Sequence, residues 1–299
     1  MKIKEINSGY LAVMAAAILW GTTGTAQAFA PLRTDPLTLG FFRIASGGLF
    51  LLLIDLPKHG LQTITKPWPV LGALGSALGM GFYQVFFFAA LLRTGVAVGT
   101  MITIGSAPII ASLWGYLLFR EKLTYRWVVA TVLAIGGCIL LSIPSDSLNI
   151  DPAGVIMALL AGVCWATAGS FMKKMPPNRS PLEKTAIMLL VGSLLITPLV
   201  VTRDLSWSLT PRGMTVILYI GILATALPYC IFARGIQRVP VATAYTITLL
   251  EPATAAFLGI VLLGEKLTLL AFSGMVLIFA GLAILSGKSR RKASPVLRR

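Results

Sequence analysis

The sequence predicts an all-α integral membrane protein whose ten transmembrane helices form two inverted five-helix repeats. Its composition supports this, because 57% of the 299 residues are hydrophobic, 12% are charged and the mean hydropathy is +0.87. A soluble protein of this composition would lack the polar residues to cover its surface. Two further observations, a series of long apolar segments and a repeated sequence pattern, specify the arrangement.

Ten apolar segments follow one another along the chain. They are residues 6–32, 37–56, 67–92, 94–119, 127–145, 152–172, 185–202, 213–233, 240–263 and 267–287. Each can cross a bilayer, which takes about 20 helical residues. Helices are expected because backbone polar groups in hydrocarbon must pair within their own segment. Eight segments carry no charge, whereas the second contains Arg43 and the ninth contains Glu251.

The two halves of the chain share residues at a nearly constant offset. The tetrapeptide Glu-Lys-Leu-Thr occurs at residues 121–124 and again at 265–268, an offset of 144. Pro108 and Pro252 have the same offset. The chain therefore contains a duplicated unit.

This duplication predicts a first five-helix repeat at 1–146, a second at 147–287 and a basic cytoplasmic tail at 288–299, all in one membrane domain. Since five is an odd number, the second repeat enters the membrane in the opposite orientation. Inverted repeats of this kind are typical of alternating-access transporters. The first helix follows two lysines, as a secretory signal does, but its counterpart in the second repeat indicates that it is retained.

Basic residues are distributed unevenly between the two sides of the membrane. With a cytoplasmic amino terminus, 19 of the 25 Lys and Arg residues lie in inner segments, five lie in outer loops, and Arg43 lies within a span. Because basic residues stay on the cytoplasmic side, both termini are predicted to be cytoplasmic and the protein to cross the cell inner membrane several times. The net charge of +15 then reflects attraction to anionic lipid and not nucleic-acid binding.

The sequence contains no pattern typical of catalysis or cofactor binding. Cys138, Cys164 and Cys230 lack metal-ligand or disulfide spacing, and His59 is the single histidine. Residues 281–289 resemble a phosphate-binding loop, but five residues separate the glycines instead of four. We therefore expect no enzyme activity, no metal and no cofactor.

Arg43 and Glu251 are the clearly intramembrane charges of the sequence. Ionisable groups at this depth are costly and face the protein interior or a wet cavity, so both are candidate functional residues. Glu251 is also a candidate for exchanging a proton during transport. The structural alternative is that each side chain holds helices together through backbone carbonyls, or that the two pair with each other.

Polar and aromatic residues are expected to line a central cavity. On the ninth helix Tyr245 and Thr248 share one face, whereas their fourth-helix equivalents are Met101 and Ile104. The other predicted substrate-binding residues are Trp20, Thr23, Gln27, Tyr83, Gln84, Trp165 and Tyr229. Aromatic walls with few hydrogen-bonding groups suit a small amphipathic or aromatic solute better than a sugar phosphate. Ordinary packing is the alternative for each aromatic residue, and a bond to its own helix is the alternative for each threonine.

Pro108 and Pro252 occupy equivalent positions in the fourth and ninth helices. Helices broken at repeat-related positions are a common sign of a central transport site. We therefore expect the two prolines to interrupt their helices and to act as paired hinges. A simple packing kink is the alternative.

The chain resembles, over both halves, the ten-helix EamA-type permeases of the drug/metabolite transporter superfamily. The resemblance is carried by Trp20-Gly21, by Pro36 followed by Arg43, by the Pro108 helix ending in residues 120–124, and by Glu251-Pro252 leading to residues 264–268. It implies inner-membrane export of amino acids, other metabolites or toxic cations. The aromatic-rich interior is similar to that of YddG-like aromatic amino-acid exporters.

These features predict an inner-membrane transporter that exports aromatic or large neutral amino acids, or related small metabolites, by alternating access. Its expected partners are the solute and membrane lipid, with a proton as a candidate coupling ion. The first, third, fourth, sixth, eighth and ninth helices would surround the cavity, with the fifth and tenth outside it. One alternative is a drug or cation efflux permease in which Glu251 attracts the cation. Another is a non-transporting membrane scaffold or subunit, against which the short loops argue.

Overall fold

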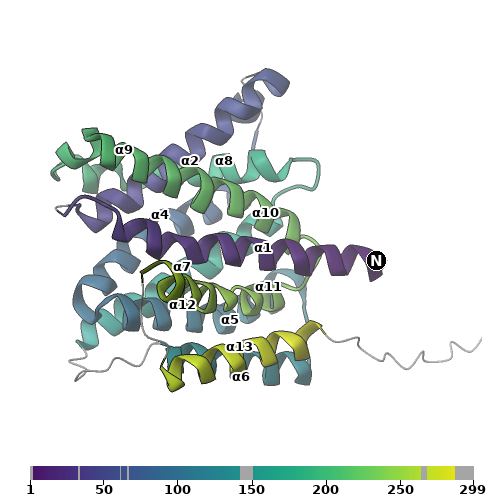
Figure 1. Ribbon diagram of the computed structural model, residues 1–299. Coiled ribbons are helices and arrows are strands. Elements are labelled where there is room, and N and C mark those ends of the chain that lie inside the picture. The colour runs from purple at the N-terminus through teal and green to yellow at the C-terminus, as the bar shows by residue number, and fades with distance from the viewer. Residues whose placement is uncertain are drawn as a thin grey trace, which may run out of the picture.

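The computed structural model describes residues 3–32, 34–60, 62–65, 67–141, 151–263 and 268–286, and all regular structure in these ranges is helical (Figure 1). The first half contains α1 (Ile3–Ala28), α2 (Pro36–His59), the short α3 (Gln62–Thr65), α4 (Val70–Thr94), α5 (Val96–Phe119) and α6 (Tyr125–Leu141). The second contains α7 (Pro152–Lys174), α8 (Pro181–Val200), the short η1 (Ser206–Leu209), α9 (Pro211–Leu218), η2 (Tyr219–Ala226), α10 (Leu227–Ile236), α11 (Val241–Ile247), α12 (Leu250–Leu263) and α13 (Leu269–Ser286).

Nine helical segments among the described residues are long and apolar enough to cross a membrane. Two of them are composite, because α9, η2 and α10 form one span and α11 and α12 form another. The tenth apolar helix, α6, has 17 residues and is shorter than the other spans. The segment expected at 127–145 runs into residues 142–150, which lie outside the described part of the chain. Within the described part of the chain the all-helical fold is thus confirmed, with nine candidate membrane spans and one shorter apolar helix.

Several helices begin with a capping residue followed by proline. The capping side chains of Asp35, Asp151, Ser180 and Thr210 each accept a backbone N–H group from the first turn of the helix that follows. Proline fits the first helical position, where its missing N–H would have had no partner within the helix. The sequence thus fixes where α2, α7, α8 and α9 start.

The packing of the halves follows a two-fold pattern. Helix α4 packs against α7, and their repeat counterparts α10 and α1 also pack against each other. In the same way α5 packs against α7, and their counterparts α12 and α1 are in contact. Helix α2 packs against its own counterpart α8, and α6 against α13, which lie side by side in Figure 1. An inverted duplication produces this exchange of partners, because each contact between the halves has a symmetry-related copy. The repeat boundaries at 146/147 and 287/288 stay a prediction.

The contact between α6 and α13 depends on small residues. A Cβ atom on Gly137 would lie 2.5 Å from the carbonyl oxygen of Gly274, and one on Gly274 would lie 2.6 Å from the carbonyl oxygen of Gly137. Glycine at both positions lets the two backbones touch, which is how helices associate where lipid removes most of the hydrophobic driving force.

The repeated tetrapeptide has one shared local role in the two halves. Thr124 accepts a hydrogen bond from the backbone N–H of Trp127 at the start of α6, and Thr268 accepts one from Ala271 at the start of α13. Threonine at both positions therefore caps the last helix of its half. Residues 264–267 and 287–299, which include the predicted basic tail at 288–299, lie outside the described residues.

The expected interruptions are found in the second half but not in the first. Helix α11 ends at Ile247 and α12 begins at Leu250, so the ninth span breaks just before Pro252. By contrast, α5 continues from Val96 to Phe119 with Pro108 inside it, and the predicted interruption at Pro108 is wrong. Transmembrane helices tolerate proline because neighbouring groups and local adjustments satisfy the freed backbone carbonyl.

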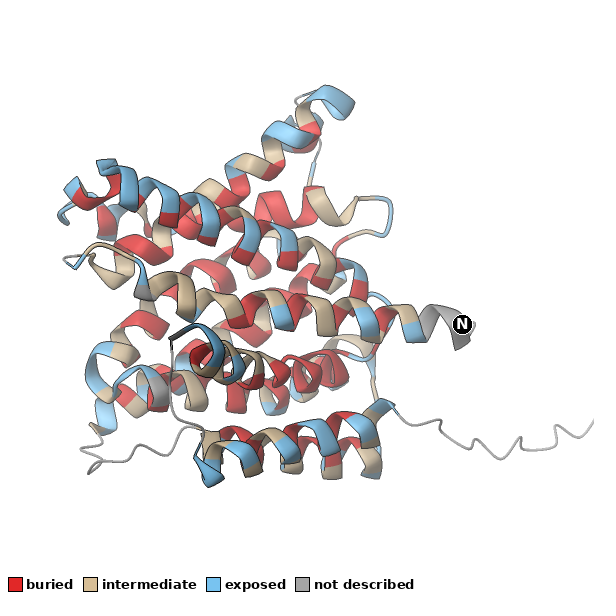
Figure 2. Ribbon diagram, in the orientation of Figure 1, coloured by how far each residue is buried: buried red, intermediate tan, exposed pale blue. Residues whose placement is uncertain are grey.

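Burial follows the pattern expected for a chain surrounded by lipid. Figure 2 shows buried positions on the faces that the helices turn toward one another, with exposed positions on the outer faces. Many of the exposed side chains are large and apolar, including Leu11, Leu92, Val132 and Phe272. Such residues on every outer helix would be unfavourable in water but match a hydrocarbon environment.

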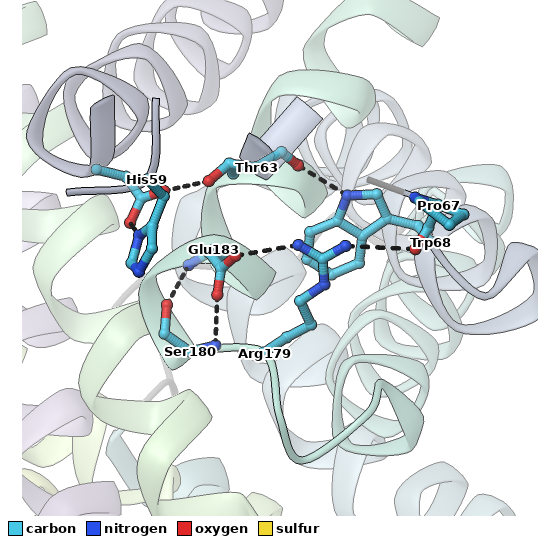
Figure 3. A network of polar contacts seen from close by, with 8 residues as sticks. His59, Thr63, Pro67, Trp68, Arg179, Ser180 and Glu183 are labelled. Atoms are coloured by element: carbon cyan, nitrogen blue, oxygen red, sulfur yellow. Dashed lines mark hydrogen bonds and ion pairs between the residues drawn. The ribbon is translucent and has the colours of Figure 1, made fainter. Parts of the chain in front are cut away.

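A polar network joins the halves where α2 and α7 end (Figure 3). The indole N–H of Trp68, just before α4, donates to the carbonyl of Thr63 at 2.8 Å. The guanidinium of Arg179 lies 4.4 Å from the centre of the Trp68 ring and pairs with Glu183 of α8 at 3.1 Å. His59 is bonded to Asp55 at 2.8 Å within the same network. This cluster ties the connection between α2 and α4 to the connection between α7 and α8.

Candidate solute-binding site

A cavity of about 420 Å³ lies between the two halves of the bundle. It is bounded by α1, α2, α4, α5, α7, α10 and α12, with the last residue of α6 at its edge. The predicted site residues that line it are Trp20, Thr23, Gln27, Arg43, Tyr83, Trp165, Tyr229, Glu251 and Pro252. The structure therefore brings together residues from six different spans that the sequence separates by up to 232 positions (252 minus 20).

The floor of the cavity is a cluster of buried aromatic rings. The ring centre of Trp20 lies 4.8 Å from that of Tyr229 and 5.9 Å from that of Trp165, both in edge-to-face geometry. Tyr83 lies 6.3 Å from Trp165 and extends the cluster across α4. Edge-to-face pairs at these separations are favourable beyond the area they bury. The floor is thus a rigid apolar surface contributed by both halves.

The mouth of the cavity lies where α1 ends and α5 begins. Gly24 is exposed, and a Cβ atom there would meet no other atom within 4 Å. Gln27 near the end of α1, Val96 at the start of α5 and Leu141 at the end of α6 line the same opening. We name this side of the bundle the open end and the side where α1 begins the closed end. Leu141 also shows that α6, expected to lie outside the cavity, reaches its rim.

At the open end, Arg93 of α4 pairs with Asp151, which caps α7, at 2.9 Å. This hydrogen bond holds the pKa of the exposed Asp151 carboxyl below its usual value. The pair joins α4 and α7, which pack against each other along their length, and so it does not close the mouth.

Arg43 brings a buried positive charge to the cavity wall from α2. Its Nε donates to the hydroxyl of Thr225 at 3.2 Å. Thr225 belongs to η2, a widened π-helical segment whose backbone hydrogen bonds join residues five apart instead of four. Such segments frequently occur at functional sites, and this one directs a hydroxyl toward α2.

Glu251 brings a carboxylate to the same cavity from the first turn of α12, directly after the break in the ninth span. The unpaired N–H groups of a helix start favour negative charge nearby. Among the described residues its side chain has no hydrogen-bond partner, and no ion pair within 4.0 Å joins it to Arg43. The two charges therefore line one cavity without neutralising each other directly.

Two further polar groups of the wall lack partners. Trp20 Nε1 and Thr23 Oγ1 are buried and have no hydrogen bond to any described residue. Buried polar atoms are nearly always paired, so unpaired ones beside a cavity are consistent with a site that a ligand completes.

Four predicted site residues lie away from the cavity wall. Gln84 is buried beside α2, where its amide nitrogen is 3.5 Å from the sulfur of Met80. The hydroxyl of Tyr245 donates to the carbonyl of Trp165 at 2.5 Å, and Thr248 donates back to the carbonyl of Tyr245 at 2.7 Å. Pro108 lies within α5, likewise outside the lining. Their functional roles stay predictions.

The two-fold relation explains why Thr248 and Pro108 are not in the wall. The repeat counterpart of Thr248 is Ile104 and that of Pro108 is Pro252, and both counterparts line the cavity. Thr248 and Pro108 thus hold the equivalent positions on the side of the aromatic floor that faces the closed end. They would line a cavity that opens there instead.

The closed end is sealed by charged groups whose pairing the sequence does not indicate. Nζ of Lys173, at the end of α7, lies 2.8 Å from Oε1 of Glu121 and donates to the carbonyl of Val239 at 2.7 Å. Oε2 of Glu121 accepts the backbone N–H of Val241, the first residue of α11, at 2.7 Å. The side chains of Lys173 and Glu121 are 12% and 16% exposed. We name these four residues the latch.

Local sequence places Glu121 in the latch. Arg120 adopts a left-handed conformation, with φ of 55°, that ends α5 and turns the chain back. Glu121 then donates its N–H to the carbonyl of Gly115 at 3.1 Å, and a Cβ atom at position 115 would lie 2.6 Å from its Oε2. Glycine at 115 therefore leaves room for the carboxylate.

Comparisons with known proteins agree with this architecture. Residues 7–143 and residues 152–287 each match the EamA-like transporter family. The uncharacterized transporter YwfM of Bacillus subtilis (strain 168) is 41% identical over 282 residues, which cover 94% of this chain and 95% of that protein. The threonine/homoserine exporter RhtA of Escherichia coli (strain K12) is 29% identical over 269 residues, covering 86% and 83%.

A chain of known crystal structure superimposes with a TM-score of 0.80 and covers 93% of this chain and 96% of its own, at 20% identity. That similarity concerns the fold alone. The family and the named relatives are transporters and not enzymes, while the finer resemblance to YddG-like exporters stays a prediction. Because both halves match and a relative exceeds 40% identity over nearly the whole chain, this multi-pass membrane protein belongs to the EamA-like transporter family, within the drug/metabolite transporter superfamily.

Proposed function

We propose that this protein exports amino acids, with aromatic or large neutral side chains, or closely related small metabolites, across the cell inner membrane by alternating access. The observation that carries the proposal is the cavity between the halves, open at one end and sealed by the latch at the other. A transporter of this mechanism needs such a site, reachable from one side at a time.

The distribution of basic residues supports the proposed orientation. Lys58, Arg120, Lys173 and Arg238 belong to the closed end, where α1 begins and α13 ends (Figure 1). Basic residues favour the cytoplasmic side, so the closed end is cytoplasmic and both termini lie in the cytoplasm. The cavity then faces outward, the state from which an exporter releases its solute.

The chemistry of the cavity supports the proposed solute. One relative is named a threonine/homoserine exporter, which favours amino acids as a class. The floor of Trp20, Trp165, Tyr83 and Tyr229 favours a larger apolar or aromatic side chain over a small polar one. The volume of about 420 Å³ is in the range of sites for small molecules.

Efflux of organic cations is the second candidate, and Glu251 is the observation that favours it. An unpaired carboxylate beside aromatic rings attracts a cation through both charge and cation–π contacts. The same carboxylate is the candidate for proton coupling, because it lies in the solute path and is not neutralised by an ion pair with any described residue. The buried Arg43 in the same wall argues against a site built for cations alone.

Counterflow in proteoliposomes tests the proposal. Liposomes that contain the purified protein and are loaded with unlabelled phenylalanine should accumulate labelled phenylalanine. Leucine, tyrosine and tryptophan should compete with this uptake. Trp165→Ala should abolish most of this uptake because it removes the centre of the floor, whereas Phe272→Ala, on the lipid-facing side of α13, should not. A protein that carries acidic or phosphorylated solutes but no neutral amino acid would refute the proposal. A pH gradient of either sign then reports on proton coupling.

A further inference from the structure

We infer that the cavity recognises the free zwitterion of an amino acid, with the α-carboxylate at Arg43 and the α-ammonium at Glu251. This inference rests on the proposed function. It adds that the carboxylate and the ammonium of the solute are both bound, and it names the residue that binds each. It follows from the charges, the unpaired polar atoms and the aromatic floor of one cavity.

Arg43 and Glu251 come from opposite halves, line the same cavity and form no ion pair with each other or with any other described residue. Charges at membrane depth are costly unless they are paired. Two opposite charges held apart in one cavity are therefore complementary to a solute that carries both.

An amino acid has the shape that these two charges require. The ammonium and carboxylate of an amino acid are bonded to the same carbon atom, so a small cavity can pair both at once. A carboxylate alone would leave Glu251 unpaired, and an amine alone would leave Arg43 with only the hydroxyl of Thr225. Leaving one charge buried without its partner is the larger part of the cost when a charge pair is truncated.

Two neutral polar atoms of the wall also lack a partner. Trp20 Nε1 carries only a donor, and Thr23 lies one turn further along α1 on the same face. An unpaired buried donor needs an acceptor, which a carboxylate oxygen supplies. The aromatic rings of the floor then receive the side chain, so head-group recognition is separate from side-chain selection.

The test compares solutes that differ in one charge. Counterflow is measured with phenylalanine, its amide, which lacks the carboxylate, and its N-acetyl derivative, which lacks the ammonium. A parallel series uses threonine, so that the result does not depend on which side chain the floor accepts. The free amino acid of the accepted series should compete at least about 30-fold better than either derivative, since a site built to pair a group rejects analogues that lack it.

Two variants assign the groups. Arg43→Gln should bring the amide to within about threefold of the free amino acid and leave the N-acetyl derivative excluded, and Glu251→Gln should do the reverse. Arg93→Gln and Asp151→Asn remove exposed charges at the open end and should leave the ranking unchanged. If a variant fails to fold, the wild-type ranking still decides whether the site requires both charged groups of the solute.

The outcomes separate the inference from the proposed function. Relaxed selection at the expected group in each variant supports the inference. Equal competition by a derivative and its free amino acid in the wild-type protein, or the same change of ranking in both variants, overturns the inference but leaves transport standing. Folded wild-type protein that moves no member of either series overturns the proposed function and the inference with it.

Discussion

Breaking the latch is predicted to open the closed end of the bundle. Glu121 accepts two hydrogen bonds that cross between the halves, one from Lys173 and one from the N–H of Val241. Glu121→Gln keeps the size and one acceptor but removes the charge. Hydrogen bonds to charged groups contribute about 1.5–3 kcal/mol, and the low exposure of both side chains places this pair in the upper part of that range.

A loss of about 2 to 3 kcal/mol corresponds to a change of roughly 30- to 150-fold in the equilibrium between closed and open states. The reporter is Ala244→Cys in a chain without native cysteines. Ala244 is fully buried, and its repeat counterpart Thr100 lines the cavity at the open end. Opening of the closed end should therefore expose position 244, and the rate of its modification should rise by that factor while the open population stays small.

The assay measures modification by a membrane-impermeant thiol reagent from the cytoplasmic side, in inside-out vesicles. Asp151→Asn is the matched control. It breaks the ion pair between Arg93 of α4 and Asp151 at the start of α7, which lies at the open end and does not hold the closed end shut. Gly115→Ala should give a smaller increase than Glu121→Gln, since the new methyl group displaces the carboxylate without removing its charge. An unchanged rate in folded Glu121→Gln, or an equal increase in Asp151→Asn, would show that the latch does not hold this end closed.

The remaining predictions concern packing, capping and orientation. Gly137→Leu should lower the melting temperature in detergent by several degrees, because a leucine side chain cannot fit against the carbonyl of Gly274. Gly136→Leu is the control and should not lower it, since a Cβ atom at position 136 would meet no other atom within 4 Å. Thr124→Ala and Thr268→Ala should each lower the stability by about 1 kcal/mol, the usual value of a helix cap, and restoration by serine would show that the hydroxyl is responsible. Single cysteines at positions 122 and 266 should be labelled from outside intact cells only at 266, and labelling of both would contradict the inverted orientation.

The fold was largely predictable from the sequence because its causes are local and repeated. Long apolar segments require membrane helices, and the offset between the tetrapeptides identifies the duplication. The unequal behaviour of Pro108 and Pro252 was not predictable from the offset. Whether proline breaks a helix depends on the groups around it, and α5 continues through Pro108 while the ninth span breaks at residues 248–249.

The types of residue in the site could be predicted from the sequence, but not which of the candidates line the cavity. The aromatic residues Trp20 and Trp165 were expected in the wall, and both lie there. Sequence patterns, however, do not indicate which side of the floor is open, so Tyr245 and Thr248 were assigned to a wall that this conformation does not form. Lys173 was counted only among the basic residues of one side, because a partner 52 positions away leaves no local signal.

The charges of the cavity break the two-fold symmetry of the bundle, and this has a consequence for transport. The repeat counterparts of Arg43 and Glu251 are Met188 and Ala107, both fully buried and uncharged. Under the proposed alternating access, a second charged site would therefore not arise when the other end opens. One pair of charges, contributed by one helix of each half, would serve both states. Rocking of the halves would then move the walls around a fixed head-group site, while the side chain of the solute meets Ile104 in one state and Thr248 in the other.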